Sequence, residues 1–118
     1  MPIDEATLRR LRAGLEQQRD HLRDEIRSLG ADPETDDVTF VDDAGFADRS
    51  HSAEERSRAI ALVGTHRATL RSVDHALARF EDGTYGTCER CGEPIAVERL
   101  EAIPWAVLCI RHAQESGR

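Results

Sequence analysis

The apolar residues of the first thirty positions recur at intervals of three and four. They are Leu8, Leu11, Leu15, Leu22, Ile26 and Leu29. Leucine at every seventh position makes a narrow apolar seam, which is typical of a coiled coil rather than of a broad globular face. The pattern predicts one helix over residues 4–29, with Asp4 as its N-cap and Gly30 at its C-terminal cap.

A second seam with the same alternation of four and three follows later in the chain. It consists of Ala59, Val63, His66, Leu70, Val73, Leu77 and Phe80. It predicts a helix over residues 49–82, capped by Ser50 or Ser52 and ended by Asp82 and Gly83. Because His66 lies on the seam, we expect it to be a packed core residue.

Two seamed helices separated by a short polar stretch predict an antiparallel hairpin. The expected fold is mostly α: an antiparallel coiled-coil helical hairpin over residues 1–82, then a small zinc finger and a short C-terminal helix over residues 83–118. The last helix is expected at residues 110–116.

The segment between the two predicted helices, residues 30–48, is acidic. It holds seven acids and no base: Asp32, Glu34, Asp36, Asp37, Asp42, Asp43 and Asp48. The formal net charge of the chain is also −7, so this segment accounts for all of it and the rest is balanced. On composition alone such a charge run is a solvated loop, here at the acidic tip of the hairpin.

The overall composition limits the size of the core. With 118 residues, one third of them charged and only 4% aromatic, the chain is expected to need coiled-coil packing, a metal, or both. The negative charge disfavours general binding to a DNA backbone. There is no apolar stretch of the roughly 20 residues that a membrane span requires, and no signal peptide is visible. We therefore expect a cytoplasmic protein with no membrane partner.

The three cysteines and one histidine near the C-terminus form two closely spaced pairs. Cys88, Cys91, Cys109 and His112 read as Cys-x2-Cys, seventeen residues, then Cys-x2-His. This spacing predicts one zinc ion with four protein ligands, which is structural because no position is left for water. Free thiols beside a surface histidine are the alternative, and His112 could be a bystander. The sequence contains no recognisable catalytic set, so no enzyme activity is expected.

The C-terminal third resembles the DksA/TraR zinc-finger family. The resemblance rests on residues 85–92 (Tyr-Gly-Thr-Cys-Glu-Arg-Cys-Gly), residues 98–102 (Glu-Arg-Leu-Glu-Ala), Pro104 and residues 108–110 (Leu-Cys-Ile). It is specific over residues 76–112 and only architectural before them. It implies a coiled-coil hairpin, a zinc finger and a C-terminal helix. It also implies a transcription factor that binds bacterial RNA polymerase in the secondary channel, without sequence-specific DNA binding.

The chain departs from the family pattern at the tip. The family carries Asp-x-x-Asp-x-Ala there, which falls on residues 45–50 of this chain. Asp48 matches the second aspartate, whereas Gly45 and Ser50 replace the first aspartate and the alanine. Asp42 and Asp43 lie close by and, with Asp48, are the candidates for a contact with the polymerase.

Two further departures concern ligands. The fourth metal ligand of the family is usually cysteine, and here it is His112. Family members that respond to guanosine tetraphosphate use basic residues where this chain has Ser72, Ile103 and Ala113. Arg99 matches a basic position, but a single arginine is insufficient for a polyphosphate, so this site is not expected.

Three functions follow from these observations. The leading hypothesis is a transcription regulator that binds RNA polymerase and inserts its acidic tip in the secondary channel to modulate initiation. The alternatives, without polymerase binding, are an adaptor that self-associates through the heptads of Leu8 and Leu15, and a thiol or zinc redox sensor.

Overall fold

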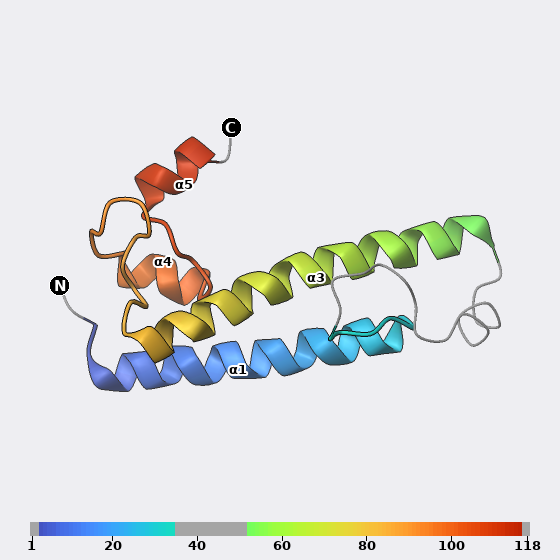
Figure 1. Cartoon of the computed structure of the whole chain (residues 1–118), viewed down its shortest axis with the longest axis horizontal. Coiled ribbons are helices and arrows are strands. Elements are labelled where there is room, and N and C mark those ends of the chain that lie inside the picture. The colour runs from blue at the N-terminus through green and yellow to red at the C-terminus, as the bar shows by residue number, and fades with distance from the viewer. Residues whose placement is uncertain (1–2, 35–51, 117–118) are drawn as a thin grey trace. The chain divides into compact units, whose positions relative to one another are not determined.

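The protein is helical in a computed structural model that describes residues 3–34 and 52–116. The helices of these ranges are α1 (Glu5–Ser28), α3 (Ala53–Asp82), α4 (Val97–Ala102) and α5 (Ile110–Ser116), as Figure 1 shows. The two long helices pack as a hairpin and are followed by the Cys/His region and a short C-terminal helix, so the predicted fold class is confirmed. The short helix α4 was not predicted.

Helix α1 has the two caps that its sequence predicts. The Asp4 carboxylate accepts a hydrogen bond of 2.7 Å from the backbone N–H of Thr7. At the other end Gly30 has a φ of +91°, and the N–H of Ala31 donates to the carbonyl of Ile26 over 3.1 Å. This bond across a left-handed glycine is a Schellman cap, which stops the helix.

Helix α3 is capped in a similar way. The Ser52 hydroxyl accepts a 3.1 Å hydrogen bond from the N–H of Glu55, whereas Ser50 lies outside the described residues. At the C-terminal end Gly83 has a φ of +78°, and the N–H of Thr84 donates to the carbonyl of Arg79 over 2.9 Å. Both long helices therefore end on a glycine with positive φ, where a Cβ would be strained.

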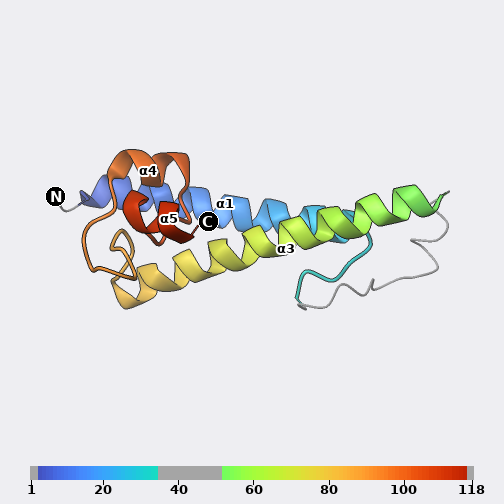
Figure 2. The ribbon, with the colours of Figure 1, turned by 90° about the horizontal axis from the view of Figure 1, so that it is seen from above.

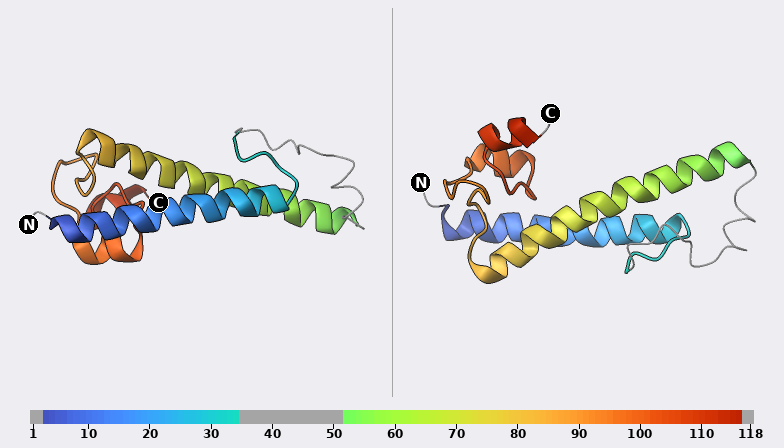
Figure 3. Two further views of the ribbon diagram at one scale, coloured as in Figure 1. Left: turned by 90° about the horizontal axis from the view of Figure 1, so that it is seen from below. Right: turned by 45° about the horizontal axis from the view of Figure 1, so that its top comes forward.

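The chain forms two compact units. The metal-site unit consists of residues 1–18 and 72–118, and the helix-pair unit consists of residues 19–71. In the metal-site unit the first turns of α1 lie beside the last turns of α3 and beside α4 (Figure 2). In the helix-pair unit the end of α1 lies alongside α3 (Figure 3). The predicted division after residue 82 stays a prediction.

The core of the metal-site unit joins the helices to the loops after α3. Its buried members are Leu11, Cys88, Ile95, Leu100 and Ala106. Phe80, at the end of α3, stacks on Tyr85 with ring centroids 3.9 Å apart and an interplanar angle of 17°. Aromatic stacking of this kind adds about 0.5–1.5 kcal/mol to the burial of the rings. The loops are therefore held against the helices by packing as well as by any metal.

The predicted seam is largely buried on α1, whereas on α3 only three of its seven residues are buried. Fully or nearly fully buried seam residues are Leu11, Leu15, Leu22 and Ile26 on α1 and Val63, Leu70 and Val73 on α3. His66 differs from the expectation, because it is only half-buried. The adjacent Arg67 takes the buried position, with 4% of its surface exposed.

None of the helices in the described ranges is long and apolar enough to cross a membrane.

The N-cap of α1 predicts a dependence of stability on pH. Hydrogen bonds from Thr7, first from its side chain and then from its backbone, hold the pKa of Asp4 below its ordinary value of 3.8. The carboxylate therefore contributes stability above pH 3.8, and this contribution is lost as the pH falls through the lower, folded-state pKa. Asp4→Ala should lower the free energy of unfolding at pH 7, and its difference from the wild type should shrink below pH 3.8. Denaturant titrations at several pH values measure both.

Asp4→Asn is the matched control, because its amide oxygen still accepts the Thr7 bond but does not titrate. The difference between Asp4→Asn and Asp4→Ala should therefore persist at low pH. If wild type and Asp4→Ala differ equally at pH 7 and pH 2.5, the carboxylate charge has no part in the cap.

Candidate metal centre

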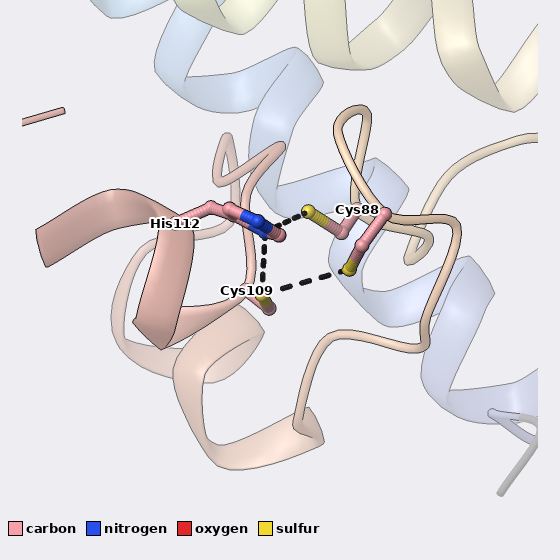
Figure 4. Close-up of side chains that lie close together, drawn as sticks. Cys88, Cys109 and His112 are labelled. Atoms are coloured by element: carbon pink, nitrogen blue, oxygen red, sulfur yellow. Dashed lines mark hydrogen bonds between the residues drawn. The ribbon is translucent and has the colours of Figure 1, made fainter. Parts of the chain in front are cut away.

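The four predicted ligands come together in the metal-site unit. Cys88 and Cys91 lie in the turn that follows α3, Cys109 immediately precedes α5, and His112 lies in the first turn of α5. Figure 4 shows Cys88, Cys109 and His112 pointing toward one another. The ligand atoms of all four residues lie within 4.8 Å of one another. Among the described residues, no other group of three or more histidine, cysteine and acidic side chains comes together in this way.

The distances between these atoms fit a tetrahedral metal site. Nδ1 of His112 lies 3.5 Å from Sγ of Cys88 and 3.3 Å from Sγ of Cys109, and the sulfurs of Cys91 and Cys109 are 3.9 Å apart. Zinc–sulfur and zinc–nitrogen bonds of ordinary length place tetrahedral ligand atoms about 3.5–3.8 Å apart. The arrangement also identifies Nδ1 as the nitrogen of His112 that faces the sulfurs.

Backbone hydrogen bonds shape the turn that carries the first two cysteines. The N–H of Gly92 donates to the carbonyl of Cys88 over 3.0 Å, and the N–H of Cys88 donates to the carbonyl of Glu93 over 2.8 Å. Gly92 has the positive φ that the sequence predicts, +75°. The N–H of Glu89 donates to the carbonyl of Val107 over 2.9 Å. This bond connects the turn to the segment that leads into the second ligand pair.

The electrostatics of the cysteines favour a bound cation. Burial is the largest influence on Cys88 and raises its pKa, but hydrogen bonds from the backbone of Cys109, Cys91 and Arg90, with one from His112, outweigh it and lower the pKa to about 5. At Cys91 the backbone of Glu93 is the largest influence and lowers the pKa. Burial and the neighbouring thiols outweigh that bond and raise the pKa above its ordinary value. The cluster thus favours one thiolate and resists a second, which is the repulsion that a metal ion relieves.

Arg79, in the last turn of α3, anchors the metal-binding turn to the helix. Its guanidinium donates to the carbonyl of Thr84 over 2.8 Å and to that of Thr87, and it pairs with the Glu89 carboxylate at 3.0 Å. Only 11% of the side chain is exposed. Glu89 also contacts His75 of α3. This role of Arg79 was not predicted, although a basic residue in the last turn of a helix is a recognisable signal in the sequence.

Two further side chains fix the loop between the ligand pairs. The Tyr85 hydroxyl donates to the carbonyl of Pro104 over 2.8 Å, and burial raises the pKa of Tyr85 to about 12. Nε of Arg99 donates to the carbonyl of Leu108 over 3.0 Å, directly before Cys109. Arg99 therefore has a structural partner within the metal-site unit.

The three residues predicted to contact the polymerase, Asp42, Asp43 and Asp48, lie outside the described residues. The structure therefore gives interatomic distances for the predicted metal ligands, whereas the role of these aspartates stays a prediction from the sequence.

Comparison with known proteins places the Cys/His region in a described family of domains. A family model described as the prokaryotic dksA/traR C4-type zinc finger matches residues 83–115. The description is of four cysteines, whereas this chain has His112 at the fourth position.

Whole-chain comparison extends the similarity to the helices. The RNA polymerase-binding transcription factor DksA of Escherichia coli strain K12 is 34% identical over 108 residues, which cover 92% of this chain and 70% of that protein. DksA of Caulobacter vibrioides is 43% identical over 72 residues, or 61% of this chain and 50% of that protein. An uncharacterized protein of Aquifex aeolicus is 57% identical over 51 residues, which are 43% of this chain and 35% of that protein.

The fold has a solved counterpart. The structure of transcription factor DksA2 from Pseudomonas aeruginosa superimposes with a TM-score of 0.71 at 32% sequence identity. The alignment covers 97% of this chain and 85% of that chain. The matches to the Aquifex and Caulobacter proteins span half or less of those proteins, whereas the structural match is nearly complete.

The contacts of Arg79 predict that it supports the metal from outside the ligand set. Arg79→Met removes the bonds to Thr84, Thr87 and Glu89 but keeps an apolar side chain of similar length. Groups that orient metal ligands typically contribute 10–100-fold to affinity, so zinc should bind about 10–100-fold more weakly. Competition with a chromophoric chelator measures this change.

Arg10→Met is the control. Arg10 belongs to the same unit and forms an exposed ion pair with Glu101 at 3.6 Å, far from the ligand-bearing turn in sequence. Its loss should leave zinc affinity within about twofold, because exposed ion pairs contribute little. Equal affinities for Arg79→Met and wild type would mean that the turn holds its conformation without the arginine.

Proposed function

The chain belongs to the DksA/TraR zinc-finger family, and we propose that it is a transcription regulator that binds bacterial RNA polymerase directly. The observation that carries the proposal is the similarity to proteins named as polymerase-binding factors, which extends over 92% of the chain and both long helices. The named relatives are transcription factors rather than enzymes. A cytoplasmic location follows from this function.

The proposal assigns one structural zinc ion to Cys88, Cys91, Cys109 and His112. The fit rests on interatomic distances that match tetrahedral coordination and on a donor set of sulfur and nitrogen, which zinc prefers. With four protein ligands the ion has no open position for a substrate, so it acts as a cross-link between two chain segments eighteen residues apart. The chain's own residues orient the ligands through the bonds of Arg79 and Arg99.

The proposed effect on transcription belongs to the acidic segment between α1 and α3. We infer that it enters the secondary channel of the polymerase, with Asp42, Asp43 and Asp48 as the contacting residues. Carboxylates can bind a magnesium ion or displace its ligands, so aspartates near the polymerase active site would perturb initiation. Support comes from the sequence, which concentrates acids in this segment and matches the family at Asp48.

The proposal does not include binding of guanosine tetraphosphate or sequence-specific binding of DNA. The positions that would bind guanosine tetraphosphate hold Ser72, Ile103 and Ala113, and Arg99 is engaged with a backbone carbonyl, so this nucleotide is not a proposed ligand. Sequence-specific DNA binding is also not proposed. Three of the cationic groups near the metal site are engaged internally or paired: Arg79, Arg99 and Arg90, which lies 3.8 Å from Glu115.

The structure does not favour the self-associating adaptor. Of the two leucines whose heptad would pair with a second chain, Leu15 is fully buried within the metal-site unit and Leu8 is partly buried. A seam that is already covered by the chain's own residues has little apolar surface left for a partner.

Binding to the polymerase is tested with the zinc-loaded full chain. The protein should retain the cognate core polymerase in a pull-down at low salt, and the triple variant Asp42→Asn, Asp43→Asn, Asp48→Asn should bind within about threefold of wild type yet lose its effect on initiation in a transcription assay. The separation is expected because the aspartates act at the active site, whereas most of the contact area lies elsewhere.

The matched control neutralises three exposed acids on the helices, with Asp20→Asn, Asp24→Asn and Asp74→Asn combined. It makes the same change in net charge and should keep the effect on initiation. Failure of the wild type to bind core polymerase sinks the proposal. Equal loss of the effect on initiation in both triple variants would mean that the effect depends on the net charge of the protein and not on the position of the tip aspartates.

The ligand role of His112 has its own test. His112→Ala should lower zinc affinity by at least about tenfold, since it removes one of four ligands, whereas His112→Cys should restore tight binding because it recreates four thiolates. Zinc content after dialysis and chelator competition report the outcome. If His112→Ala binds zinc as tightly as wild type, the histidine is a bystander.

A further inference from the structure

The apolar seam of α3 contains a buried charge without a partner. Arg67 is 4% exposed, and its three guanidinium nitrogens are each shielded from solvent without a hydrogen-bond partner in the described part of the chain. Arginine remains charged in proteins. Burial of such a charge without a counter-charge is strongly unfavourable, because neither water nor a carboxylate replaces its hydration.

The surroundings of Arg67 offer little compensation. Val63 and Leu70, four and three residues away on the same helix face, are buried apolar side chains. In the same unit, Leu22 and Ile26 of α1 are also buried, and Nε of Arg23 is a second buried N–H without a hydrogen bond. Glu34 forms an ion pair with that nitrogen at 3.9 Å, which is too long for a hydrogen bond.

The same stretch of α3 has weak helical propensity. A Cβ at Gly64 would meet nothing within 4 Å, so close packing does not require glycine there, and glycine lowers helix stability relative to alanine. Two threonines follow at helical spacing. Thr65 donates its hydroxyl to the carbonyl of Ala61 and Thr69 to that of Thr65, each over 3.2 Å. Such back-bonding slightly destabilises helices and often bends them.

We propose that residues 61–71 of α3 form a point of local opening within the helix-pair unit, in which the backbone hydrogen bonds of this stretch break, the helix pair separates and the guanidinium of Arg67 reaches water. The closed pair buries apolar surface, and the open state regains the hydration of Arg67. The balance between these two terms makes this stretch the least stable part of the long helices. A helix pair that opens locally can change its conformation when a partner binds, while the metal-site unit stays folded.

Native-state amide hydrogen exchange of the zinc-loaded full chain tests the proposal. In the wild type, amides of residues 61–71 should exchange at least tenfold faster than those of residues 73–80. Their rates should rise less steeply with low denaturant than those of residues 73–80, because a local opening exposes less surface than global unfolding does. Arg67→Met, which keeps the length and removes the charge, should slow exchange at residues 61–71 at least tenfold and leave residues 73–80 unchanged.

Three variants make the result specific. Arg67→Lys keeps a buried charge and should leave exchange fast. Gly64→Ala should slow it independently of Arg67, because it acts through helix propensity. Arg58→Met removes an exposed arginine from the same helix and should change nothing. The proposal is overturned if exchange at residues 61–71 is as slow as at residues 73–80, or if Arg67→Met leaves it unchanged or makes it faster.

Discussion

The convergence of Cys88, Cys91, Cys109 and His112 on one point is the constraint on which the C-terminal part of the molecule depends. The segment between the ligand pairs has one helix of six residues, and an isolated bridge joins Pro94 in this segment to Thr87, directly before the first pair. Segments this short cannot fold on hydrogen bonds alone, because the cost of ordering them exceeds what so few bonds return. A tetrahedral site that joins both ends of the loop removes much of that cost, since the metal is bound only when the loop is closed.

The ligands are in turn held by groups that belong to the long helices. Arg79 bonds to two carbonyls of the segment before Cys88, and Phe80 stacks on Tyr85, whose hydroxyl reaches the carbonyl of Pro104. The end of α3 therefore contacts the beginning of the loop, and Tyr85 joins that part of the loop to Pro104. A small core suffices here because each contact closes a different stretch of chain, and the apolar cluster around Leu100 fills the space between them.

The helix-pair unit follows another principle. It has no metal-binding cluster among its described residues, and its seam accommodates the charge of Arg67 between Val63 and Leu70. A protein that only needed stability would have an apolar residue at that position, because replacing a buried unpaired charge by an apolar group of similar volume is usually stabilising. The two units are therefore stabilised in different ways. The metal-site unit is held by its Cys/His cluster and by packing, whereas the helix-pair unit retains a buried charge without a hydrogen-bond partner among the described residues.

Local chemistry largely determined what the sequence could predict. The caps at Asp4, Ser52, Gly30 and Gly83 depend on side chains or φ values that act within a few residues, and the ligand spacing depends only on the reach of a turn. The rotational phase of the α3 seam was decided by tertiary structure. Position 66 and position 67 are about 100° apart on the helix, and which of the two is buried depends on how the folded chain packs around α3, which local sequence does not specify. Tertiary structure also explains why α4 and the bonds of Arg79 were not predicted. Helix α4 has only six residues and no side-chain N-cap, so no local signal marks its start. The partners of Arg79 lie only five to ten residues along the chain, but the folded loop after α3 is what brings the carbonyls of Thr84 and Thr87 to its guanidinium.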